Sequence, residues 1–205
     1  MRIGTILLLL AGLLILFGAG QRVLDRMRLT DREALLFIAL IIAGGYLPDI
    51  RVTEYFAFNI GGALIPLGLC AYLFFKADTV GERARAVLAP IVTAAAVYGL
   101  GRALPSDPAE LMFDPNYLYG LVAGVIAYAF GRSRRCAFIA GVVGVTLANL
   151  AAWATVRVQG VPQRLVLGGA GGYDVIVISG LLAVLLAELI GELLERMTRP
   201  AIERK

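Results

Sequence analysis

The stretch GGAGGYDVIVISGLLAVLLA, residues 168–187, indicates the fold class because it is a long apolar run that favours a hydrocarbon environment. A bilayer's hydrocarbon layer is about 30 Å thick, so a spanning helix needs about 20 mostly apolar residues. The run therefore predicts a transmembrane helix. It also carries one carboxylate, Asp174, near its start. What an acid does at that place is the central question of the sequence.

The rest of the chain has the composition of a membrane protein. Of its 205 residues, 60% are hydrophobic and only 17% are charged. Seven segments of about spanning length are bounded by charges, Pro or Gly. They cover residues 3–20, 33–50, 55–75, 84–101, 117–131, 136–156 and 167–194. Each is continuously apolar, without the alternation of a barrel strand, so we predict an all-α transmembrane helix bundle that forms one integral membrane domain over residues 1–205.

Basic residues predict the orientation of this bundle. Most of the 19 Lys and Arg residues lie in the first, third and fifth connections and in the C-terminal tail. Cytoplasmic loops are enriched in Lys and Arg, so we expect the N-terminus outside and the C-terminus in the cytoplasm, which requires an odd number of spans. Anionic head groups explain the basic balance, so no nucleic-acid partner is expected. The expected location is a prokaryotic cytoplasmic membrane.

The first apolar segment, residues 3–20, has some features of a secretory signal, with a basic residue before it and small residues after it. Its apolar core is longer than a usual signal core, and arginines follow it. We expect it to remain as an uncleaved first helix.

Two residue types limit the chemistry. The chain has no His, and its two cysteines, Cys70 and Cys136, lie in or beside predicted helices. A standard zinc site, a haem with His ligands and a catalytic triad with imidazole are therefore excluded. No metal and no cofactor is expected, and any proton chemistry falls to carboxylates, Tyr, Lys or Cys.

The third and seventh segments are predicted to be irregular. Within residues 55–75 a polar amide, two flexible residues and a helix breaker follow one another: Asn59, Gly61, Gly62 and Pro66. This order predicts either a simple Pro kink or an unwound stretch near residues 59–66. In the seventh segment, glycines that include Gly171 and Gly172 precede Tyr173 and Asp174, so the helix starts either late or near Leu167. Helix breaks at membrane depth are tolerated where protein or a wet cavity covers them.

Asp174 needs a favourable environment inside a membrane. An ionised Asp at the bilayer centre costs about 2.5–3.5 kcal/mol, and less near the edge. The acid is therefore protonated, faces a wet cavity, or has a donor or cation as partner. On the same outer side of the predicted topology lie two carboxylates, Asp49 and Asp114, and four arginines, Arg51, Arg102, Arg157 and Arg164. Either class of partner is compatible with the sequence.

Two stretches resemble known families. NIGGALIPLGL, residues 59–69, and the stretch at 168–187 resemble the signature segments of a prokaryotic membrane family, domain of unknown function 1614. This resemblance covers most of the chain after the first helix and implies no established activity. The run from Gly171 to Leu186 is also similar to the Gly-x-Gly-Asp motif of the presenilin and signal-peptide-peptidase class, which implies Asp174 as one of two catalytic acids. Tyr173 stands where that motif has a glycine, and the Pro-Ala-Leu motif is missing.

Three functions remain open. The first is a carrier or channel-like protein whose broken helices contact a small solute or cation. Its candidate binding residues are Asn59, Gly61, Gly62, Pro66, Gly171, Gly172, Tyr173 and Asp174. The second is an intramembrane aspartyl protease in which Asp174 acts with Asp49 or Asp114. The third is a non-catalytic membrane scaffold or accessory subunit in which Asp174 fixes helix packing. A non-enzymatic role is the main expectation, with the lipid bilayer as partner; formation of a homo-oligomer is left open.

Overall fold

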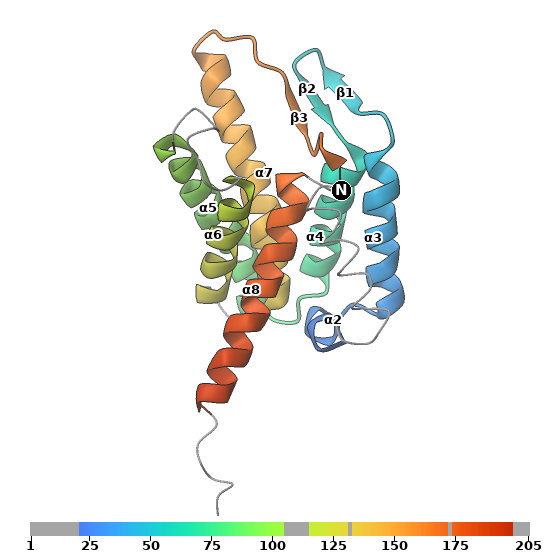
Figure 1. Ribbon diagram of the computed structural model, residues 1–205, viewed down its shortest axis with the longest axis vertical. Helices are drawn as coiled ribbons and strands as arrows, with labels where there is room; N and C mark the ends of the chain where they lie inside the picture. The colour runs from blue at the N-terminus through green and yellow to red at the C-terminus, as the bar shows by residue number, and fades with distance from the viewer. Residues whose placement is uncertain (1–20, 105–114, 131–132, 172–173, 199–205) are drawn as a thin grey trace, which may run out of the picture.

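The computed structural model describes residues 21–104, 115–130, 133–171 and 174–198 (Figure 1). The helices are α2 (Gln21–Met27), α3 (Asp31–Gly45), α4 (Ile65–Phe75), α5 (Val80–Ala103), α6 (Pro115–Ala129), α7 (Arg134–Val158) and α8 (Val175–Thr198), with a π-helix, η1 (Ile60–Leu64), before α4. Three short strands complete the fold: β1 (Ile50–Thr53), β2 (Phe56–Phe58) and β3 (Leu165–Leu167). Helices α3 to α8 alternate in direction, and the sheet lies beyond one end of the bundle (Figure 1).

Three helices in the described part of the chain are long and apolar enough to cross a membrane. They are Val80–Ala103, Arg134–Val158 and the Val175–Leu194 part of α8. A shorter apolar helical stretch covers Ile60–Phe75. The expected segments 84–101, 117–131 and 136–156 correspond to α5, α6 and α7, whereas the expected first helix at 3–20 lies outside the described residues.

Two expected helices are corrected by the structure. The segment expected at 33–50 ends as a helix at Gly45, shortly before Pro48, and residue 50 already begins β1. The segment expected at 55–75 begins with a strand, β2, and becomes helical only at Ile60. A short apolar run is compatible with either a helix or a strand. Here the run forms a strand because it pairs with other strands.

The three strands form one sheet in the order β1-β2-β3. β1 and β2 are antiparallel, whereas β2 and β3 are parallel, with Phe56 opposite Leu165 and Phe58 opposite Leu167. Trp153 of α7 packs on Phe56 with a ring-centroid distance of 5.5 Å. The sheet therefore ties the connection between α3 and η1 to the connection between α7 and α8.

Helix α7 forms the centre of the bundle, and nearly all of it from Arg134 to Ala148 is buried. Small residues on α7 allow the neighbouring helices to approach closely. A Cβ on Gly141 would lie 2.7 Å from the Ser179 carbonyl oxygen of α8. A Cβ on Gly144 would lie 2.6 Å from Cγ2 of Thr93 in α5.

The start of α3 follows from a local sequence pattern. Thr30 and Glu33 have the spacing of a capping box, in which each side chain satisfies a backbone amide of the other residue. The Glu33 amide donates to Thr30 Oγ1 at 3.2 Å, and the Thr30 amide donates to Glu33 Oε2 at 2.8 Å.

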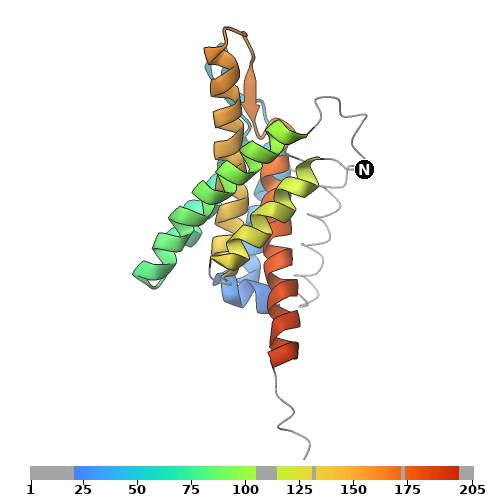
Figure 2. The same ribbon diagram turned by 90° about the vertical axis from the view of Figure 1, so that its left-hand side faces the viewer.

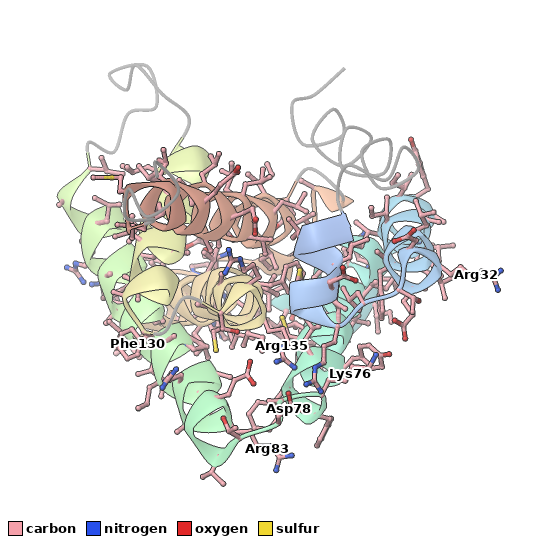
Figure 3. The ribbon with its side chains drawn as sticks, turned by 90° about the horizontal axis from the view of Figure 1, so that it is seen from below. Arg32, Lys76, Asp78, Arg83, Phe130 and Arg135 are labelled. Carbon is pink, nitrogen blue, oxygen red and sulfur yellow. The ribbon has the colours of Figure 1, made fainter. Side chains whose placement is uncertain are left out.

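Ion pairs hold together the end of the bundle opposite the sheet, which we call the basic end (Figure 3). Arg28 before α3 pairs with Asp78 between α4 and α5. Arg135 of α7 reaches the same connection, donating to the Lys76 carbonyl oxygen at 2.6 Å and pairing with Glu82 at 3.0 Å. Three connections that the sequence marks as basic therefore meet at one end.

Candidate functional site

Asn59 stands at the predicted break in the third segment. Its Oδ1 accepts a hydrogen bond from the Gly62 amide at 2.9 Å, which caps the start of η1. Its Nδ2 donates to Asp49 Oδ1 at 3.0 Å, which ties the cap to the connection after α3. The side chain is almost fully buried. The interruption is thus a strand followed by a π-helix, and Pro66 lies in the first turn of α4, where a missing N–H is tolerated.

The two irregular segments meet at a contact between backbones, which we call the glycine joint. It consists of Gly44 and Gly45 at the end of α3, Gly61 and Gly62 in η1, and Gly168 and Gly171 before α8. A Cβ on Gly62 would lie 2.1 Å from the Gly168 carbonyl oxygen, and a Cβ on Gly61 would lie 2.2 Å from that of Ile41. The Asn59 amide also donates to the Leu167 carbonyl oxygen at 2.8 Å.

Close approach is the reason for glycine at these places. Gly168 has φ +72° and Gly171 has φ +60°, a region that residues with a side chain rarely adopt. Substitution at either position would meet both backbone strain and a neighbouring chain segment. Backbone atoms of η1 and of the turn before α8 therefore occupy the space where these segments cross.

Asp174 is the residue before α8, which begins late, at Val175. Its Oδ1 accepts from the Ile176 amide at 3.1 Å, and its Oδ2 accepts from the Ala170 amide at 3.4 Å. The first amides of a helix have no partner within the helix, and a short acidic side chain at this position satisfies one of them. Burial raises the pKa of Asp174, while the two backbone hydrogen bonds act in the opposite direction. The acid at the entrance of the last span thus holds the helix start.

The structure does not join Asp174 to the expected partners that lie among the described residues. Within the described ranges, no hydrogen bond or ion pair joins Asp174 to Asp49 or to any of the four arginines expected on the same side. Arg157 lies over the Tyr55 ring at 4.1 Å, and Arg102 donates to Tyr98 at 3.1 Å. Asp114, Gly172 and Tyr173 lie outside the described residues. Asp49 and Asp174 therefore form no dyad that shares a proton in this conformation.

Metal-binding side chains do not gather in the part of the chain that is described. No group of three His, Cys, Asp or Glu side chains there could hold a metal ion. Cys70 and Cys136 are both free and buried.

One buried ion pair was not predicted. Arg134 at the start of α7 pairs with Glu188 of α8, with Nε and Oε2 2.8 Å apart. The Arg134 side chain is 6% exposed, although its position in a basic connection indicates a solvated charge. The available signal was Glu188 itself, an acid within an apolar stretch of α8.

Residues 23–186 match a family described as protein of unknown function (DUF1614). The chain belongs to this family. The match confirms the resemblance carried by residues 59–69 and 168–187, and it places the whole glycine joint inside the DUF1614 region. Neither the curated proteins nor the solved structures gave a significant match. No comparison supports the resemblance of this DUF1614 chain to aspartyl proteases.

Proposed function

We propose that this protein is a non-catalytic scaffold or accessory subunit of the cell membrane, with seven spans, an outer N-terminus and a cytoplasmic C-terminus. Support for the orientation comes from the basic end. The alternating helices bring the connections around Arg28, Lys76 and Arg135 to one end of the bundle. An excess of Lys and Arg in short loops marks the cytoplasmic side.

The observation that carries the scaffold proposal is that both candidate polar side chains form hydrogen bonds within the protein. Asn59 caps η1 and binds Asp49, and Asp174 caps α8. Backbone atoms fill the crossing between their two segments. Both polar side chains are therefore occupied by hydrogen bonds within the protein, which supports a structural role for them.

Variants of Asp174 test this proposal. Asn is as good a cap as Asp, so Asp174→Asn keeps the thermal stability of the purified protein, whereas Asp174→Ala loses about 1 kcal/mol. Vesicles containing the wild type are expected to show the same solute and cation leak as protein-free vesicles. A flux that depends on the wild type and disappears in a stable Asp174→Asn variant would replace the scaffold by a carrier.

A carrier is the second candidate, and it has one observation in its favour. Discontinuous helices that meet within a membrane protein are typical of binding sites in secondary transporters. Here η1 follows a strand, α8 starts late, and the two segments touch at Gly62 and Gly168. A carrier requires this contact to open, so a covalent cross-link that holds η1 to the turn before α8 would stop transport and leave a scaffold unaffected.

A further inference from the structure

An apolar groove opens between α4, α5 and α7, away from the glycine joint. Its volume is about 430 Å³, which is in the range of ligand pockets. Its walls include Ala71 and Phe75 of α4, Val87 and Ile91 of α5, and Ile139 and Leu147 of α7. The lining is almost entirely apolar, so the groove favours a hydrocarbon occupant.

The groove results from how α5 crosses α7. The two helices touch where Gly144 faces Thr93 and again where Glu82 pairs with Arg135 at 3.0 Å, and the N-terminal half of α5 slants away from α8 (Figure 2). Val87 and Ile91 lie on this half and are 51% and 54% exposed. Small side chains at Ala71 and Ala86 leave the space between the helices open.

The groove ends at a positive charge. Residues four apart lie on the same face of a helix, so Arg83 lies one turn below Val87, and Arg135 one turn below Ile139. Lys76 directly follows Phe75. Figure 3 shows Lys76, Asp78, Arg83 and Arg135 around the connection between α4 and α5. All three walls of the groove therefore lead to the basic end.

Arg83 is the cation of this group that is free to bind an anion. The nearby acids are engaged: Asp78 with Arg28, Glu33 with Lys76, and Glu82 with Arg135. Arg83 is exposed and donates to the Ala77 carbonyl oxygen at 3.3 Å, and no carboxylate among the described residues pairs with it. Arg135, by contrast, is paired with both Glu82 and Asp78, so Arg83 is the cation at this end of the groove that is left for a phosphate.

We propose that the groove binds one acyl chain of an anionic phospholipid, with the lipid phosphate at Arg83. A hydrocarbon slot that ends at an unpaired cation at the basic end matches the two parts of such a lipid. Basic pockets between membrane helices on the cytoplasmic side recognise anionic head groups. This inference goes beyond the scaffold function, because it assigns a ligand to a surface distinct from the glycine joint.

The test measures binding of phosphatidylglycerol and phosphatidylcholine to the purified full-length protein by native mass spectrometry. The wild type is expected to retain phosphatidylglycerol preferentially. Arg83→Gln weakens that binding about fivefold, the effect of one basic residue near a membrane surface. The matched control is Arg32→Gln, since Arg32 is exposed at the same end but points away from the bundle (Figure 3).

A second pair of variants tests the slot for the chain. Ala71→Trp fills the groove and is expected to lower retention of both lipids, whereas Ala39→Trp, at an exposed position on α3 outside the groove, keeps it. Equal binding of the two lipids by the wild type, or equal losses in Arg83→Gln and Arg32→Gln, would overturn the proposal. So would an Ala71→Trp variant that retains its lipid, or one that only dissociates a dimer, which would assign the groove to a second copy of the chain.

Discussion

The glycine joint and the groove are two helix crossings with opposite outcomes. At the joint, six glycines bring the backbones of three segments into direct contact. At the groove, α5 and α7 touch at Thr93 and Gly144 and again at Glu82 and Arg135, and between these contacts the side chains of α4, α5 and α7 leave an apolar hollow. The residues that stand out in the sequence, Asn59 and Asp174, lie at the closed crossing. The open crossing is lined by ordinary apolar residues, so unusual residues here mark demanding backbone geometry rather than free space.

The largest expected effect is a difference in stability between alanine substitutions at two glycines of neighbouring helical segments. Gly62→Ala places a Cβ 2.1 Å from the Gly168 carbonyl oxygen, and we expect it to lower the free energy of unfolding by about 3 kcal/mol. The Cβ introduced by Gly68→Ala on α4 meets nothing within 4 Å. This variant should raise the free energy of unfolding by about 0.5–1 kcal/mol, because alanine loses less backbone entropy than glycine on folding. Thermal unfolding in detergent, followed by circular dichroism, measures both. Similar unfolding of the two variants would mean that the joint is not closed.

The next effect concerns the cap of η1. Asn59→Ala removes the hydrogen bond to the Gly62 amide and the one to Asp49, so we expect a loss of about 2 kcal/mol. Asn59→Ser restores a cap but does not reach Asp49, and should recover about half. Chemical denaturation in detergent gives the three free energies. If the alanine variant matched the wild type, the capping geometry would be wrong.

A smaller effect depends on pH. Burial raises the pKa of Asp174 above its value in the unfolded chain, so the native protein binds this proton more readily than the unfolded one. The stability that protonation of Asp174 contributes is fully present below the pKa of this residue in the unfolded chain. It is lost as the pH rises through the raised pKa of the native protein. The wild type should therefore gain stability relative to Asp174→Asn when the pH is lowered from 7 towards 4. Melting curves of the pair at several pH values show the trend, and an unchanged difference would argue for a well-solvated carboxylate.

The smallest effect is expected in the groove. Ala71 is exposed and its neighbours leave space, so Ala71→Trp should change the free energy of unfolding by less than about 0.5 kcal/mol. Ala63, which is fully buried beside Gly168, provides the contrast, because a Trp there has no room and should cost about 3 kcal/mol or more. Equal damage at both positions would show that the groove is filled in the folded protein.

Sequence patterns predicted the features that depend on local chemistry. Continuous apolarity located α5, α6 and α7, the Thr30 and Glu33 spacing gave the start of α3, and the Asn-Gly-Gly-Pro order located the break before α4. The strands were missed because Phe56–Phe58 is short and apolar, and its partner Leu165–Leu167 is far away in the chain. The groove was missed because it depends on a crossing angle, which no single segment encodes.

The parallel pairing of β2 with β3 has a consequence for biogenesis. Phe58 emerges from the ribosome about a hundred residues before Leu167, which at 5–20 residues per second is a delay of about 5–20 seconds. During that interval the edge of β2 that pairs with β3 has no strand beside it. The turn around Gly168, which packs against Gly62, has not yet been synthesised. Assembly of the sheet must therefore wait until residues 165–167 have been synthesised, and a chain truncated before residue 165 would leave that edge of β2 without its partner strand.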